Sequence, residues 1–233
     1  MLVHERYKIK KKAIFEYQVL MKKIKDELQH IIFGDEQTGR TSQLKKVQTF
    51  LRRHAETSSP AQNQKRFKSE ETAELINFGR REKLFYERKI SEEDFIASGA
   101  EQRVYRLDET SVIKTNGSIF YEYWLDYFNS LLIHNYYFPA TAYTFIGFKI
   151  IGDELYAVVR QEFVSTTEAT DLVAVKQFLT YNQFFNTRNN DYINTDLGII
   201  FEDLHDENVL SKNSILFFVD TIFYITPNFY SRS

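Results

Sequence analysis

The sequence predicts an α+β fold with an N-terminal helical extension, and two observations carry this prediction. Over the first 90 residues, apolar side chains recur at steps of three and four, which is the spacing of one face of a helix. From about residue 96 the pattern changes to short apolar runs separated by turn residues, which is typical of strands joined in hairpins. The chain has 21 Phe and 15 Tyr but only 8 Gly and 3 Pro, a composition that favours a well-packed core.

The first predicted helix carries a single apolar stripe. Its members recur at helical spacing and are Ile14, Tyr17, Met21, Ile24, Leu28 and Ile31. Gly34 follows the stripe and is a favourable residue just past a helix end. A shorter second helix is predicted over about 42–54, and the polar segment 55–68, which contains Pro60, is interpreted as a linker.

Two acidic segments mark further helix starts. Ser69 precedes Glu70 and Glu71, and acidic residues favour the positive end of a helix dipole, so a third helix is predicted to begin at Ser69. The segment 91–94, Ser-Glu-Glu-Asp, resembles a second capping signal.

Two hairpins are predicted in the following part of the chain. The first pairs 103–107 with 111–115 across a short polar turn. The second pairs 145–151 with 155–160, and its Gly-Asp turn at 152–153 is typical of a tight connection. These strands are the β component of the predicted fold.

Helices are predicted on either side of the second hairpin. The apolar spacing over 118–134 predicts one helix, with Ser118 as its cap, and residues 171–181 predict another. Beyond 181, short strands alternate with the loop 201–210. The predicted order is therefore strands, one helix, strands, and then a mostly helical part with a hairpin that holds this loop.

Charge divides the chain into two regions. Residues 1–90 hold 21 Lys and Arg against 12 Asp and Glu, a net charge of +9, whereas residues 91–233 hold 9 against 20, a net charge of −11. The basic residues are scattered through helical patterns, and no recognised DNA-binding motif accompanies them. A solvated basic helical face is therefore favoured over a nucleic-acid-binding one, and nucleic-acid binding by residues 1–90 is kept as a third and weaker hypothesis.

Several classes of site are excluded by composition. The chain has no cysteine, which excludes disulfides, thiolate zinc sites and a cysteine nucleophile. Its 5 His residues have no zinc-binding spacing, and no Gly-x-Ser-x-Gly segment indicates a hydrolase. No apolar stretch approaches the length of a membrane span, and the first residues do not form a secretory signal. A cytoplasmic protein without a membrane partner is expected.

The stretch that carries the most chemistry is 201–210, Phe-Glu-Asp-Leu-His-Asp-Glu-Asn-Val-Leu. It places Asp203 five residues before Asn208, and an apolar run over 215–219 then leads to Asp220. This pattern favours phosphoryl transfer from ATP, in which one carboxylate accepts the proton of the acceptor while an amide oxygen and a second carboxylate hold Mg²⁺.

Three upstream segments belong to the same pattern. They are the turn Ser98-Gly-Ala-Glu-Gln-Arg-Val-Tyr105, the strand end Val112-Ile-Lys114 and the strand 156–164. Together with 201–220, they resemble the protein-kinase-like superfamily, and most closely the polyvalent protein kinase domain of bacterial mobile-element proteins. The resemblance covers about 96–225.

This resemblance implies a minimal two-lobed protein-kinase-like fold. Residues 91–164 would form the N-lobe and hinge, and residues 165–233 would form a truncated C-lobe with the catalytic loop. The basic helical residues 1–90 would be an extension that completes the lower lobe from the other end of the chain.

The resemblance also implies a site for ATP and Mg²⁺. Asp203 would be the catalytic base, Asn208 and Asp220 would be the metal ligands, and Lys114 would bind the phosphates with Glu122 as its partner. The other nucleotide contacts implied are Gly99 and Val104 over the phosphates and adenine, and Glu162 to Val164 as the hinge. The acceptor would be a hydroxyl group on a protein or a small molecule.

The sequence also departs from the family pattern. Phe201 replaces the usual histidine of the loop, Thr221-Ile222 replaces Phe-Gly, and only 13 residues follow Asp220. His205 is expected to shape the loop rather than to act as the base. These departures leave a second hypothesis open, in which the chain is a nucleotide-binding pseudokinase that serves as an interaction module.

Overall fold

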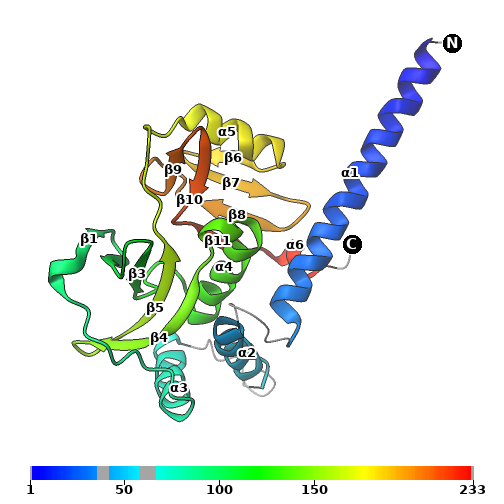
Figure 1. The fold of residues 1–233 in the computed structure, drawn as a ribbon. Helices are drawn as coiled ribbons and strands as arrows, with labels where there is room; N and C mark the ends of the chain where they lie inside the picture. The colour runs from blue at the N-terminus through cyan, green and yellow to red at the C-terminus, as the bar shows by residue number, and fades with distance from the viewer. Residues whose placement is uncertain (1, 36–41, 58–66, 232–233) are drawn as a thin grey trace.

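The computed structural model describes residues 2–35, 42–57 and 67–231, with side chains from residue 16 onward (Figure 1). It combines helices with antiparallel sheets, so the predicted α+β class is confirmed. The helices are α1 Leu2–Phe33, α2 Ser42–Thr57, α3 Lys68–Arg81, α4 Trp124–Tyr137, α5 Leu172–Tyr181 and α6 Pro227–Tyr230. Short 3₁₀ turns cover Glu92–Asp94 and Pro139–Thr141. Most of segment 55–68, including Pro60, lies outside the described residues.

The strands form three antiparallel sheets. The strand bounds are β1 Phe95–Ser98, β2 Gln102–Arg106, β3 Ser111–Asn116, β4 Thr144–Ile151, β5 Glu154–Glu162, β6 Phe185–Arg188, β7 Asp191–Asn194, β8 Ile199–Glu202, β9 Val209–Lys212, β10 Ile215–Phe218 and β11 Ile222–Ile225. A five-stranded sheet has the order β1-β2-β3-β5-β4, a four-stranded sheet has the order β11-β8-β7-β6, and β9 pairs with β10. Both predicted hairpins, β2–β3 and β4–β5, are confirmed.

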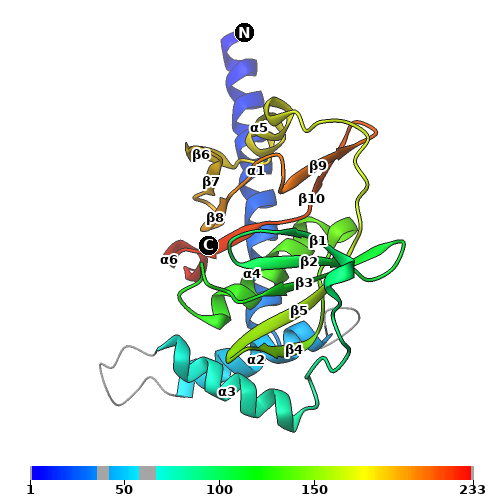
Figure 2. The same cartoon turned by 90° about the vertical axis from the view of Figure 1, so that its left-hand side faces the viewer.

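Helix α4 lies at the centre of the molecule, between the five-stranded sheet and the four-stranded sheet (Figures 1 and 2). Every residue from Tyr127 to His134 is buried, which is typical of a helix that neighbours cover on all sides. Helix α2, β11, α1 and α3 all contact it. The core is accordingly one continuous cluster that runs from Met21 in α1 to Phe229 in α6.

The predicted start of α4 at Ser118 is wrong, because the helix begins at Trp124. Ser118 adopts a left-handed φ of 54° and is followed by a turn rather than a helix. The cap comes from another helix, since the carboxylate of Glu71 in α3 accepts a hydrogen bond of 2.6 Å from the backbone N of Trp124. A buried carboxylate at this end also suits the helix dipole, and sequence near residue 118 could not predict it.

The other helix predictions differ only at their ends. Helix α3 begins at Lys68 rather than at Ser69, and Glu70 caps it by accepting the backbone N–H of Phe67 at 3.2 Å. Ser91 caps the following 3₁₀ turn, as the acidic segment predicted. Helix α2 continues to Thr57, three residues beyond the predicted end.

The part of the chain after β5 is not mostly helical, and this prediction is wrong. Helices α5 and α6 are short, and six strands lie between Phe185 and Ile225. The apolar runs in this part, such as Ile199–Glu202 and Ile222–Ile225, are only four residues long, which is typical of strands and too short for helices.

The first three helices pack against the rest of the fold. Two of them, α2 and α3, lie beside α4 and β4, and the ring of Phe50 stacks on Phe78 with centroids 4.0 Å apart. Helix α1 contacts the C-terminal segment, where Lys25 and Gln29 donate to the backbone oxygens of Asn228 and Phe229 at 2.7 and 2.5 Å. The predicted division at residue 90 therefore separates segments that share one core.

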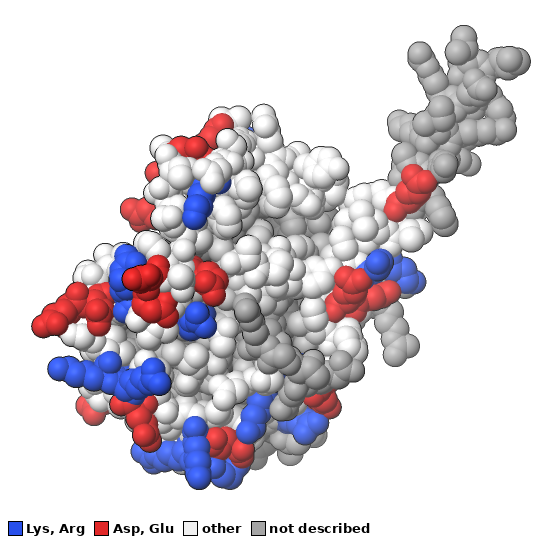
Figure 3. Space-filling model, viewed as in Figure 1, with Lys and Arg blue, Asp and Glu red and all other residues white. Residues whose placement is uncertain are grey.

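Charged side chains of both signs are interspersed on the face shown in Figure 3. Described basic residues pair with acidic ones, as in Lys46–Glu82 at 2.8 Å and Arg103–Glu92 at 2.7 Å. A solvated, mixed-charge surface agrees with this arrangement, and the absence of a nucleic-acid partner stays a prediction. No helix among the described residues is long and apolar enough to cross a membrane.

We predict that Gly198→Ala lowers the free energy of unfolding far more than Gly152→Ala. Both glycines have left-handed φ angles, of 72° and 63°, so a side chain at either position costs about 1 kcal/mol in strain. Only at Gly198 would the added Cβ collide with the backbone of Phe229, which adds roughly 2 kcal/mol of overpacking. Urea unfolding of the two variants measures the difference; equal losses would contradict this account of how α6 is seated.

Candidate active site

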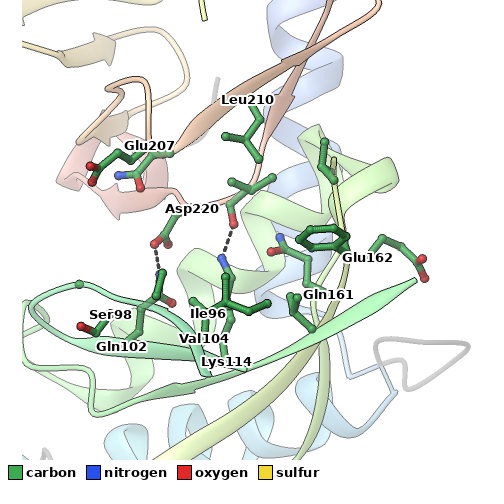
Figure 4. A pocket seen from close by; sticks show the side chains of 17 residues that line it. Ile96, Ser98, Gln102, Val104, Lys114, Gln161, Glu162, Glu207, Leu210 and Asp220 are labelled. Carbon is green, nitrogen blue, oxygen red and sulfur yellow. Dashed lines mark hydrogen bonds between the residues drawn. The ribbon is translucent and has the colours of Figure 1, made fainter. Parts of the chain in front are cut away.

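A cavity of about 260 Å³ lies between the five-stranded sheet and the β9–β10 hairpin (Figure 4). Its walls come from the β1–β2 turn, β3, the end of β5, and the loop and strands between Glu207 and Asp220. The lining residues are Ile96, Ala97, Ser98, Gly99, Gln102, Val104, Val112, Lys114, Gln161, Glu162, Phe163, Val164, Glu207, Asn208, Leu210, Val219 and Asp220.

Apolar side chains line the cavity from both sides. Val104 on β2 and Val112 on β3 come from the five-stranded sheet, and Leu210 and Val219 come from the opposite side. Such a slot suits a flat apolar ring, because it removes both faces of the ring from water. At the β1–β2 turn, a Cβ added to Gly99 would meet nothing within 4 Å, so the backbone there is open to a ligand.

The segment after β5 connects the two sides of the cavity. The N–H of Phe163 donates to Thr110 at 2.8 Å, which anchors the end of β5 beside the β2–β3 turn. Further along, Thr167 donates to the backbone of Ser211 at 3.2 Å, and Glu168 accepts from the backbone of Ser214 at 2.6 Å. Hydrogen bonds therefore anchor the segment after β5 at both of its ends.

Lys114 is a buried cation at the back of the cavity. Every residue of β3 is buried, and the Lys114 Nζ donates to the backbone oxygen of Val219 at 2.6 Å. Burial lowers the pKa of the Lys114 ammonium group, and the nearby charge of Asp220 opposes that shift. Lys114 also lies 5.4 Å from the ring centre of Tyr143, which stabilises the charge further.

Asp220 faces Lys114 from the other side of the cavity. Burial raises the pKa of the Asp220 carboxyl group, and the positive charge of Lys114 partly offsets this rise. The Gln102 side-chain amide also donates to the Asp220 carboxylate, so a hydrogen bond spans the cavity (Figure 4). A cation bound beside the Asp220 carboxylate would therefore offset the free-energy cost of burying its charge.

The loop that begins at Asp203 orients Asn208. Asp203 has a left-handed φ of 66°, which an aspartate tolerates better than most residues. The Asn208 Nδ2 donates to the backbone oxygen of Asp203 at 2.8 Å and to its Oδ2 at 2.9 Å. Since the amide nitrogen is engaged in this way, the Asn208 Oδ1 is the atom that can face a metal ion.

Seven of the nine predicted site residues line the cavity: Gly99, Val104, Lys114, Glu162, Val164, Asn208 and Asp220. Asp203 lies beside it, with a half-exposed side chain that contacts Asn208 and has its Oδ1 3.3 Å from the His205 Nε2. The predicted base therefore faces solvent at the edge of the cavity, where an acceptor can reach it.

Glu122 is not placed as the sequence suggested. It lies before α4 rather than in its first turns, its side chain is exposed, and it accepts a hydrogen bond from the Tyr123 hydroxyl at 3.1 Å. It does not line the cavity, and the carboxylate whose charge acts on Lys114 is Asp220. The late start of α4 is the reason for this difference.

Sequence reasoning missed several lining residues, and strand alternation could have found two of them. Val112 is two residues before Lys114 in β3 and Gln102 is two residues before Val104 in β2, so each pair shares one face of a strand. The contact of Gln102 with Asp220 carries no such signal, because it joins residues 118 positions apart.

The cavity offers groups of the kind that could hold a magnesium ion and phosphates. Mg²⁺ usually takes one or two protein oxygens and completes its coordination with phosphate oxygens and water. Asn208 and Asp220 offer these two groups on one wall, and Lys114 presents a buried positive charge to the same space. Among the described residues no group of three or more His, Asp or Glu forms a separate metal cluster.

We predict that the stability of the protein falls at acidic pH through His134, which is buried in α4 behind the site. Burial lowers the pKa of His134 from 6.5 to about 3. Neutral His134 therefore stabilises the fold above pH 6.5, and this contribution is lost as the pH falls toward 3. The loss amounts to about 2 kcal/mol at about pH 5.

The measurement is the free energy of unfolding from about pH 7.5 to about pH 5, for wild type and His134→Gln. Glutamine does not titrate, so the variant should lose less stability over this range. Identical pH profiles of the two proteins would contradict the prediction.

One comparison with known proteins found a match. A family model described as "Serine/Threonine/Tyrosine Kinase found in polyvalent proteins" matches residues 68–227. No curated protein and no solved structure matches the chain. The family match begins at the first residue of α3, the helix whose Glu71 caps α4, and it ends at the start of α6. The chain therefore belongs to the family of serine/threonine/tyrosine kinases found in polyvalent proteins.

Proposed function

We propose that this protein is an ATP- and Mg²⁺-dependent phosphotransferase that transfers the γ-phosphate to a hydroxyl group of a protein or small molecule. The observation that carries the proposal is the convergence of Lys114, Asn208 and Asp220 on one cavity. These residues come from distant segments of the chain, and family membership supports a kinase-like function for the cavity they form.

The proposal includes a two-lobed arrangement of the kinase type. The five-stranded sheet and α4 would form the upper lobe, and the segment after Glu162 would be the hinge. The lower lobe would consist of α5, the β9–β10 hairpin and the four-stranded sheet. The cavity between the sheet and this hairpin supports the arrangement, since nucleotide sites commonly lie between two such units.

Each residue has a distinct role in this proposal. Val104, Val112 and Leu210 would enclose the adenine ring, and the backbone at Glu162 to Val164 would contact its edge. Lys114 would bind phosphate oxygens, which compensates its own burial. The open backbone at Gly99 would cover the phosphates, where N–H groups can donate to them.

The metal and the proton would be held on the opposite wall. Asn208 and Asp220 would hold Mg²⁺, which neutralises charge that develops on the phosphates when it is bound. Asp203 would orient the acceptor hydroxyl and accept its proton as the oxygen bonds to the γ-phosphorus, while the bond from that phosphorus to the bridging oxygen breaks and ADP leaves. Its half-exposed position beside Asn208 supports this role.

A second candidate function is a nucleotide-binding pseudokinase that acts as an interaction module. Two observations favour it: Glu122 lies away from the cavity, and Gln102 donates to the carboxylate that would bind the metal. In this alternative, the cavity would bind nucleotide without transferring phosphate.

We predict that Asp203→Ala abolishes phosphate transfer but retains nucleotide binding. Loss of the base should lower the rate by about 100-fold or more, because general-base catalysis contributes about that factor. The measurement is incubation with Mg²⁺ and ATP labelled at the γ-phosphate, following label on the protein itself, on a mixture of acceptor proteins and as free phosphate. Fluorescence titration with an ATP analogue measures binding.

Asp206→Ala is the matched control, since it removes a carboxylate from the same loop whose side chain is 70% exposed. It should retain transfer. Nucleotide binding without label transfer or hydrolysis in wild type would favour the pseudokinase, and wild type that binds no nucleotide would refute both functions.

A further inference from the structure

We propose that His134 and Thr221 are a positioning pair for Asp220, and that their hydrogen bonds replace the lysine–carboxylate ion pair as the link between α4 and the metal site. This inference rests on the proposed function, because it assigns a role to residues behind the Mg²⁺ ligand. Neither residue lines the cavity.

The hydrogen bonds of His134 define which ring nitrogen carries its proton. Its Nε2 lies 2.9 Å from the backbone oxygen of Thr141, and a carbonyl oxygen can only accept, so the Nε2 donates. Burial lowers the pKa of His134, so the ring is neutral and the Nδ1 is an acceptor. The Thr221 hydroxyl, 2.7 Å from the Nδ1, therefore donates to it.

Thr221 passes this restraint directly to Asp220. Burial raises the pKa of the Asp220 carboxyl group, and the adjacent backbone N–H of Thr221 partly offsets this rise. The Thr221 side chain is buried, at 5% exposure, and its hydroxyl is held by His134. Because Thr221 is the next residue in the chain, the hydrogen bond between its hydroxyl and His134 restrains the backbone from which the Asp220 side chain extends.

The backbone on both sides of Asp220 is held in the same way. The Thr141 hydroxyl donates to the oxygen of Phe218 at 2.6 Å, and the Tyr143 hydroxyl donates to the oxygen of Val219 at 2.8 Å. Beyond Asp220, the Ser130 hydroxyl accepts from the N–H of Phe223 at 3.0 Å. All of these side chains come from α4 or the segment between α4 and β4.

The charged groups near α4 do not provide this link. Asp126 is the acidic residue of α4, and the basic side chain whose charge acts on its carboxylate is Lys68, in α3. Lys114 experiences the charge of Asp220 itself. Neutral hydrogen bonds can hold a buried segment without the desolvation cost of a second ion pair, which gives a physical reason for this construction.

The test measures the Mg²⁺ dependence of nucleotide binding. A fluorescent ATP analogue is titrated into the full chain in EDTA and at increasing Mg²⁺, for wild type, Thr221→Val and Thr221→Ser. Valine has the shape of threonine without its hydroxyl, and serine keeps the hydroxyl. Outer groups that orient a metal ligand are worth about 10–100-fold in metal affinity.

We expect Thr221→Val to require about 10-fold or more Mg²⁺ for half-saturation, with binding in EDTA within about 2-fold of wild type. Thr221→Ser should restore wild-type Mg²⁺ dependence. His134→Gln keeps a donor for Thr141 but has no acceptor at the position of the Nδ1, because its amide oxygen lies one bond further along the side chain. It should therefore behave like Thr221→Val, and it provides a second test should valine impair folding.

Thr115→Val is the matched control. Thr115 is buried in β3 at 1% exposure, its hydroxyl has no hydrogen-bond partner among the described residues, and it points away from Lys114. Its binding curves should match wild type. Melting curves show whether each variant is folded.

The outcomes separate this inference from the proposed function. If wild type binds the analogue with a clear Mg²⁺ dependence and Thr221→Val and His134→Gln keep that dependence, the positioning role is overturned and the function stands. If serine fails to rescue, the role of the hydroxyl is overturned. If wild type shows no Mg²⁺-dependent binding, the proposed function fails and the inference fails with it.

Discussion

The burial of Lys114 is the constraint on which the rest of the structure depends. An ammonium group in the interior is costly unless an opposite charge and hydrogen-bond acceptors compensate it. Here the acceptor is the backbone of Val219 and the opposing charge is Asp220, so β3 and the segment after β10 must meet. That meeting closes the cavity between the five-stranded sheet and the β9–β10 hairpin. It also leaves two oppositely charged groups beside the space in which we propose that nucleotide and Mg²⁺ bind.

Helix α4 holds the contact between β3 and the segment after β10 in place. Its hydroxyl and imidazole groups hold the backbone around Asp220, while its own first residue is capped from outside by Glu71. The N-terminal helices are therefore connected to the site through α4 rather than through direct contact with the cavity. This arrangement explains why the family match extends upstream to α3, although the recognisable site motifs begin near residue 96. The helix that precedes those motifs caps the central helix that positions them.

The residues of the candidate site were more predictable from the sequence than the residues that hold them in place. Asp203, Asn208 and Asp220 follow one another at a spacing that reflects local geometry, namely a tight loop followed by a strand pair, and local geometry is visible in sequence. Val104 and Lys114 were paired correctly because a short hairpin determines its own register. The failure at Glu122 had a non-local cause. Sequence around residue 118 favours a helix, but the cap that determines where α4 begins belongs to Glu71, which lies 53 positions away.

The sequence by itself determined the α+β class, the two hairpins, the order of the motifs and the kinase family to which they belong. Those features depend on periodicity and short spacings, which neighbouring residues specify. Only the tertiary structure decided that α4 is buried on all sides, that a sheet replaces the predicted helices of the C-terminal part, and that Gln102 and His134 act on the segment around Asp220. The Gln102 and His134 contacts join residues more than 80 positions apart, and their energies arise from burial and hydrogen bonding between elements. No local pattern records such contacts, because each partner alone looks like an ordinary polar residue.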